Sequence, residues 1–196
     1  MRTARRTTIL ALTLTSGLVL AGCNGSDSST AAGPSSTAGT DQSAAFNEVD
    51  VRFTQGMLPH HMQAVRNSEI EIAMGGAPEV KAIAQKILTE QKKEIETMQG
   101  FLKTFGAPEK QAPPDQQAVW DKNTAELRDA ATPEARDVVF LTNMVPHHSA
   151  AIPMAQLDVT QGKYLPAQEL AMQIKTVQRM EIVEMNMLIR ARTRTP

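Results

Sequence analysis

The sequence has very few cysteine, tryptophan, tyrosine and histidine residues. Its 196 residues include one cysteine, one tryptophan, one tyrosine and four histidines. A single cysteine excludes an internal disulfide and a redox-active cysteine pair. Basic and acidic residues nearly balance, at 20 and 21, so no basic excess suggests a nucleic-acid partner. We recognise no glycine-rich phosphate loop and no Ser-His-Asp arrangement, which makes an enzymatic role the less favoured expectation.

The N-terminal segment has the features of an export signal. Arginines precede an apolar stretch, residues 9–20, that is too short for a normal membrane span. The tetrad LAGC that follows ends at Cys23 and resembles a bacterial lipobox, in which the cysteine is lipidated after cleavage before it. We therefore expect residues 1–22 to be a lipoprotein signal peptide and Cys23 to carry lipid. Both Sec and twin-arginine export stay open.

The next segment differs sharply in composition from the rest. Residues 23–44 consist mainly of Ser, Thr, Gly and Ala, with almost no large apolar side chain to bury. This composition predicts a flexible tether, followed by one domain over residues 45–192. Together with the lipid, the tether predicts an extracytoplasmic domain anchored to the cell membrane.

All four histidines belong to two copies of one motif, GMLPHH at residues 56–61 and NMVPHH at residues 143–148. The copies are 87 residues apart, and the similarity extends without a gap from residues 50–98 to residues 137–185. Within that alignment 16 of 49 positions are identical. A gapless match of this length implies two copies of one structural unit.

Each copy predicts a helical hairpin. Helical spacing of apolar residues, with glycine and proline at the breaks, places helices at about 45–74 and 78–105, and again at about 132–161 and 166–191. The repeats thus cover about 45–105 and 132–191, and a short extra helix near 116–130 connects them. Two hairpins with apolar faces predict an all-α, four-helix bundle with an approximate internal two-fold axis.

The repeated motif collects metal-ligand atoms on the predicted helices. Met57 and His61 fall on one stripe with Asp50, and Glu94 shares a face of the second helix with Met98. The second copy repeats the pattern. The candidate metal-binding residues are Met57, His60, His61, Met98, Met144, His147, His148, Met154 and Met185. Asp50, Glu94, Asp137 and Glu181 are candidate ligands or residues that orient an imidazole.

The ligand types favour copper. Carboxylate-bridged di-iron bundles use Glu-x-x-His, which is missing here, and Met-x-x-His takes the same spacing at Met57 and Met144. Thioether sulfur prefers Cu(I), whereas imidazole accepts several transition metals. We therefore expect a copper site, with Cu(I) favoured and with iron and zinc as alternatives. Core packing of the methionines is the competing interpretation.

The two Met-x-Pro-His-His motifs, with Asp seven residues before each Met and a later Gln-x-x-Glu-Ile-x-x-Met, resemble a bacterial family called domain of unknown function 305. The resemblance covers about residues 45–190. It implies a ferritin-like helical bundle. Because the family includes periplasmic copper-binding proteins of the CopM type, it also implies copper binding or tolerance through the Met and His positions named above.

Three hypotheses follow from the sequence. The first is a lipid-anchored extracytoplasmic protein that binds copper for sequestration, tolerance or hand-off. The second is a ferritin-like metal-dependent oxidoreductase. The third is a metal-free envelope bundle in which the histidines make internal polar contacts. No feature of the sequence identifies a protein partner.

Overall fold

A computed structural model describes residues 45–193, in which five helices and no strand occur. The helices are α1 (Glu48–Met74), α2 (Pro78–Phe105), α3 (Pro114–Asp129), α4 (Pro133–Gln161) and α5 (Leu165–Thr193). The predicted all-α bundle with a short connecting helix is thus confirmed. None of these helices is long and apolar enough to cross a membrane. The expected signal peptide, Cys23 and the whole of the expected tether, residues 1–44, lie outside the described residues.

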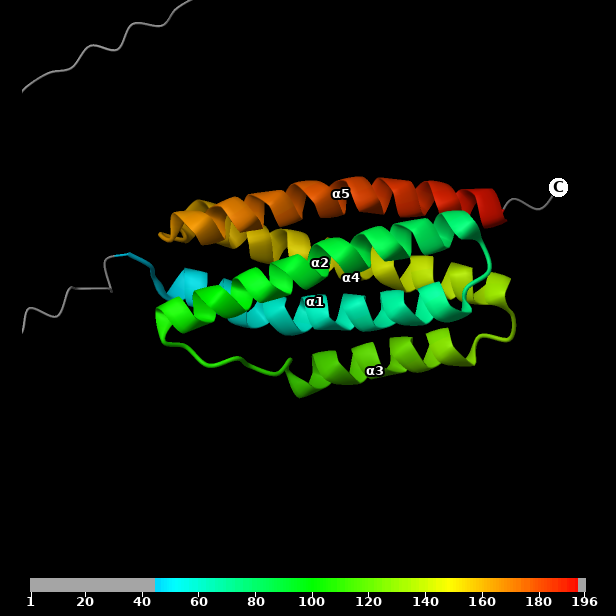
Figure 1. Ribbon diagram of the computed structural model, residues 1–196, viewed down its shortest axis with the longest axis horizontal. Helices are drawn as coiled ribbons and strands as arrows, with labels where there is room; N and C mark the ends of the chain where they lie inside the picture. Colours follow the sequence, from blue (N-terminus) through cyan, green and yellow to red (C-terminus); the bar gives the residue numbers. More distant parts are fainter. Residues whose placement is uncertain (1–44, 194–196) are drawn as a thin grey trace, which may run out of the picture. The chain divides into compact units, whose positions relative to one another are not determined.

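Two antiparallel hairpins form the bundle. Short turns join α1 to α2 and α4 to α5, and the two hairpins pack mainly through α1 against α4. The connecting helix α3 lies mainly against α1 and α4, and Figure 1 shows it running alongside α1, away from α5. Because α3 has no counterpart in the repeat, one face of an otherwise two-fold bundle is covered.

The helix ends follow local chemistry. The side chain of Asn47 accepts hydrogen bonds from the amides of Val49 and Asp50, so α1 begins at Glu48, three residues later than predicted. The side chain of Thr132 caps α4 by accepting a hydrogen bond from the amide of Ala135, with Pro133 as the first helical residue. Gly106 ends α2 in a left-handed conformation, φ 62°, that favours glycine.

Two apolar clusters make up the core. The first contains Phe53, Met57, Met98 and Phe101 among others, and the second contains Phe140, Met144, Met185 and their neighbours. Both consist entirely of residues between 46 and 189, so this segment contains its own core and can fold as one domain.

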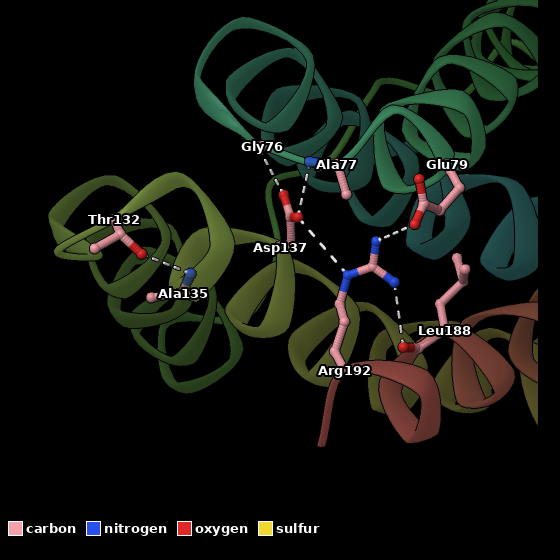
Figure 2. A network of polar contacts seen from close by, with 8 residues as sticks. All are labelled: Gly76, Ala77, Glu79, Thr132, Ala135, Asp137, Leu188 and Arg192. Carbon is pink, nitrogen blue, oxygen red and sulfur yellow. Dashed lines mark hydrogen bonds and ion pairs between the residues drawn. The ribbon is translucent and has the colours of Figure 1, made fainter. Parts of the chain in front are cut away.

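A buried aspartate from each hairpin caps the turn of the other hairpin. Asp137 accepts hydrogen bonds from the amides of Gly76 and Ala77, at 2.8 and 2.9 Å, as Figure 2 shows. Arg192 adds an ion pair to Asp137 at 3.7 Å. In the equivalent position, Asp50 accepts from the amides of Lys163 and Tyr164. These bonds link the two hairpins at both ends of the bundle.

Each aspartate also meets a second buried acid, Glu71 beside Asp137 and Asp158 beside Asp50. Burial and a hydrogen bond with Asp137 together raise the pKa of Glu71 to about 8. Burial and the neighbouring Asp50 raise the pKa of Asp158 to about 7. No donor faces either oxygen of Glu71 or Asp158, so each acid is best accommodated in its protonated form, donating to the aspartate.

The glycines that follow these acids have no room for a side chain. A Cβ at Gly75 would collide with the Glu71 carboxylate and lie 2.7 Å from its carbonyl oxygen. We expect Gly75→Ala to lower the free energy of unfolding by about 1–3 kcal/mol through overpacking. Gly100 is exposed within α2 with nothing within 4 Å of its Cβ position, so Gly100→Ala should raise stability by about 0.5–1 kcal/mol. Urea unfolding of both variants tests this, and equal effects would contradict it.

The Glu71 carboxyl should make stability pH-dependent. Its pKa is raised from 4.5 to about 8 on folding, so its contribution is complete below pH 4.5 and is lost as the pH rises to about 8. Glu71→Gln stays neutral, and its stability relative to the native chain should therefore increase across that range. Urea unfolding at several pH values measures the difference, with the exposed Glu96→Gln as control. A difference that does not change with pH would refute the protonated acid.

Candidate metal centre

A layer of buried polar side chains separates the two apolar clusters. Along each of the four long helices, residues of one cluster are followed by two polar residues and then by residues of the other cluster. The layer consists of His60 and His61 from α1, Gln91 and Glu94 from α2, His147 and His148 from α4, and Gln178 and Glu181 from α5. His147 is half-buried, with both ring nitrogens shielded, and the other seven are buried. The internal duplication thus brings two equivalent sets of four polar residues to the middle of the bundle.

His60 and His147 stack on each other across the α1–α4 interface. Their ring centroids are 3.7 Å apart with an interplanar angle of 31°. Neither nitrogen of either ring has a hydrogen-bond partner, and all four nitrogens are buried. Burial, reinforced by neighbouring imidazoles, lowers the pKa of His60 to about 3 and that of His147 well below 6.5. Both rings are therefore neutral, with free lone pairs, in mild acid as well as at neutral pH.

The other two histidines each contact a glutamate of their own hairpin. His61 Nε2 lies 2.8 Å from Glu94 Oε2, and His148 Nε2 lies 2.9 Å from Glu181 Oε2. Burial lowers the pKa of His61 to about 3. The pKa of Glu94 is raised to about 7, mainly by burial and also by the negative charge of the nearby Glu181. Burial in the layer thus disfavours both the positive charge of His61 and the negative charge of Glu94. The Nδ1 atoms of both imidazoles lack a partner.

Two glutamines of the layer were missed by the sequence reasoning. Gln91 and Gln178 are each 2% exposed, and neither the amide oxygen nor the nitrogen of either side chain has a partner. Each precedes a layer glutamate by three residues and so lies on the same helix face. They do recur in the repeat, and that recurrence was the available signal, but an amide has no strong preference for a transition metal.

The four repeated methionines lie next to the layer, one helical turn from a histidine or glutamate on the same helix. All four are almost fully buried, with Met57 and Met98 in the first cluster and Met144 and Met185 in the second. Met154 is partly buried against the first cluster. The structure therefore sets two thioethers on each side of the layer.

Asp50 and Asp137 are not brought to the histidines. They cap the turns at the ends of the bundle, as described above. The ten residues from Asp50 to His60 correspond to about 15 Å along a helix, so a shared stripe does not put these side chains together. Their carboxylates hold the hairpins in place.

The donors are present as pairs in this conformation. Within residues 45–193, no three or more His, Cys, Asp or Glu side chains converge closely enough to hold a metal ion. The pairs do fit a soft cation with few ligands, because imidazole nitrogens without partners are available. The repeated methionines lie one helical turn from a layer histidine or glutamate. The fit rests on the donor types and on their lack of other partners.

Taken together, the geometry defines a duplicated helical bundle with a buried layer of imidazole, carboxylate and amide groups. The chain belongs to the family described as domain of unknown function (DUF305), whose model matches residues 50–189. No functionally curated protein matches it.

Solved structures share the fold. A DUF305 fragment from Deinococcus radiodurans is 25% identical with a TM-score of 0.68, and the match covers 74% of this chain and 97% of that one. A DUF305 protein of Streptomyces coelicolor, assigned as secreted, is 26% identical with a TM-score of 0.66 over 74% and 92%. CopM in its Cu(I)-bound form is 25% identical with a TM-score of 0.62 over 74% and 98%. Other CopM structures hold Cu(II) or Ag.

The stacked imidazoles should add nothing to the stability of the metal-free fold. Because their nitrogens are buried without partners, we expect His60→Leu with His147→Leu to keep or raise the free energy of unfolding. His61→Leu instead leaves the buried Glu94 unpaired and should cost about 1–3 kcal/mol. Chemical denaturation in the presence of a chelator compares them. A large loss in the first variant would mean that the stacked pair is a structural contact.

Proposed function

We propose that this protein binds copper, with Cu(I) favoured, in the polar layer of the bundle. The observation that carries the proposal is the His60–His147 pair, two neutral imidazoles held together in the core with every ring nitrogen free. Burying such groups without partners costs free energy, and coordination of an ion would offset that cost. A metal-free bundle gives these nitrogens no partner, so the third hypothesis is the weaker account.

The donor set supports a soft ion. Methionine sulfur selects Cu(I), and neutral imidazole also binds copper. Because burial keeps the pKa of His60 and His61 near 3, protons do not compete for these nitrogens in mild acid. We assign Met57, Met98, Met144, Met185 and the four histidines as ligands, and Glu94 and Glu181 as ligands or as groups that orient His61 and His148. Met154 belongs to the predicted set as well, although it packs against the first apolar cluster and not in the layer.

The relatives support the same ion. CopM, of similar fold, has been crystallised with Cu(I), Cu(II) and Ag. Ag(I) shares the soft character of Cu(I). No described feature favours turnover over binding, and the proposed role is sequestration or hand-off of the ion.

The proposed location is outside the cytoplasm. The Streptomyces coelicolor relative, which is assigned as secreted, supports export, and the tetrad ending at Cys23 supports a lipid anchor. Residues 23–44 would then act as the tether between membrane and domain. Copper that enters the envelope would meet this domain before it reaches the cytoplasm.

Anaerobic titration of residues 45–196 with Cu(I) against a chromophoric chelator tests the proposal. The native domain should compete for Cu(I). A variant with the four histidines and four repeated methionines replaced should lose at least about 100-fold in affinity, equivalent to about 2.7 kcal/mol. The matched control replaces the exposed Met172, Met180 and Met187 by leucine and should bind like the native domain.

Two results would contradict the proposal. If the layer variant binds as tightly as the native domain while the surface variant does not, exposed thioethers hold the ion. If the native domain does not compete at all, Cu(I) is wrong, and the same titration with Cu(II), zinc and iron examines the alternatives.

A further inference from the structure

The connecting helix α3 covers the His60–His147 pair. It has no counterpart in the repeat, and it packs mainly on α1 and α4, the helices that carry these two residues. Its largest buried side chain is Trp120, the only tryptophan of the chain. The indole centroid lies 5.7 Å from that of His60, in an edge-on arrangement, and 6.0 Å from that of His147.

A cavity of about 290 Å³ between α3 and α4 leads to the same two imidazoles. His60, His147 and Trp120 line it, together with the carboxamides of Asn123 and Asn143. The Nδ2 atom of Asn143 is buried without a partner. The cavity therefore has both imidazoles, the indole and these two asparagines in one lining.

We propose that a copper ion reaches and leaves the His60–His147 pair through this cavity, and that the indole of Trp120 covers the bound ion. The inference rests on the proposed function, since it concerns the same site. A cation within about 6 Å of an indole centroid is attracted to the face of the ring. Trp120 is therefore assigned a role in retaining the ion beyond its packing.

The attachment of α3 allows this role. Its C-terminal end is fixed, because Arg136 donates hydrogen bonds to the carbonyls of Leu127, Arg128 and Ala130. Its middle is fixed by Thr124, which bonds to Asn67 and Gln63. Before residue 120, no side chain of α3 is fully buried. The N-terminal part is thus held by fewer contacts than the rest of α3, and Trp120, whose carbonyl accepts a hydrogen bond from Gln63, lies at the boundary.

A second groove reaches the layer between α2 and α5, and its lining differs from that of the first cavity. This groove is lined by Glu90, Glu94 and Glu169, and it reaches the glutamate partner of His61. No histidine lines that groove. An ion entering there would meet these carboxylates and the ammonium of Lys93 in place of imidazoles, so mutation of the carboxylates separates this route from the first.

The first test uses the fluorescence of Trp120 in the native domain with Ag(I) as the probe. Ag(I) is a closed-shell, heavy ion and quenches an indole only at contact. We expect emission to fall by at least about half and to saturate with the ion bound, as measured in parallel by calorimetry. The quenching should disappear in the His60→Leu, His147→Leu variant. Packing alone would not produce this signal.

The second test measures the rate at which bound Ag(I) passes to an excess of a competing chelator. Trp120→Leu should release the ion at least about tenfold faster than the native domain, and Trp120→Phe should fall between the two. The control is Val183→Ala, an exposed apolar residue of α5 that does not line this cavity. It should release the ion at the native rate.

Unchanged emission on saturating Ag(I), with a native release rate in Trp120→Leu, would overturn the inference while leaving copper binding intact. Faster release in Glu90→Gln with Glu169→Gln, but not in Trp120→Leu, would also overturn it by locating the exit in the α2–α5 groove. If the native domain binds neither Ag(I) nor Cu(I), the proposed function itself fails, and the inference with it.

Discussion

The free energy cost of an unsatisfied polar layer is the constraint on which the rest of this structure depends. Four imidazoles and two carboxamides are buried in the middle of the bundle, and most of their polar atoms have no partner. Groups of this kind persist only where surrounding structure holds them. Here the two apolar clusters lie on either side of the layer, and the cross-hairpin caps of Asp50 and Asp137 fix both ends. The fold thus supports a layer that would not assemble by itself.

Duplication explains the form of the layer. One hairpin supplies a single His-His motif, and the two-fold arrangement brings His60 against His147 while each remaining histidine keeps a glutamate of its own hairpin. Facing like residues are a consequence of such symmetry. The acids Glu71 and Asp158 show the same effect, because each meets the turn-capping aspartate of the opposite hairpin. Only α3 breaks the symmetry, and it does so over the stacked imidazoles.

Much of this could be predicted from the sequence. The repeat predicted two hairpins and an all-α bundle, and glycine and proline marked the helix ends to within a few residues. The grouping of His61 with Glu94 followed from helical spacing. The predictions that failed were those that depend on distance along a helix axis or on contact between helices. Angular position put Asp50 with Met57, although their axial separation keeps them apart.

The stacking of His60 on His147 could not be read from one copy of the motif, because it depends on how the hairpins pack. Gln91 and Gln178 were overlooked for a related reason, since an amide becomes informative only when burial leaves it without a partner. The lowered pKa values of His60, His61 and His147 also come from burial, a tertiary property. They make the imidazoles available to a metal over a wider pH range than the sequence suggests.

The most direct test of a buried histidine site is nitrogen NMR of the domain labelled with ¹⁵N at histidine. All four histidines of the chain lie in the layer, so every signal reports on it. Addition of Cu(I) or Ag(I), both diamagnetic, should shift ring nitrogens of His60 and His147 by amounts typical of direct coordination, and the shifts should saturate at the binding stoichiometry. An ion that binds stoichiometrically while every ring nitrogen keeps its metal-free shift would contradict the account.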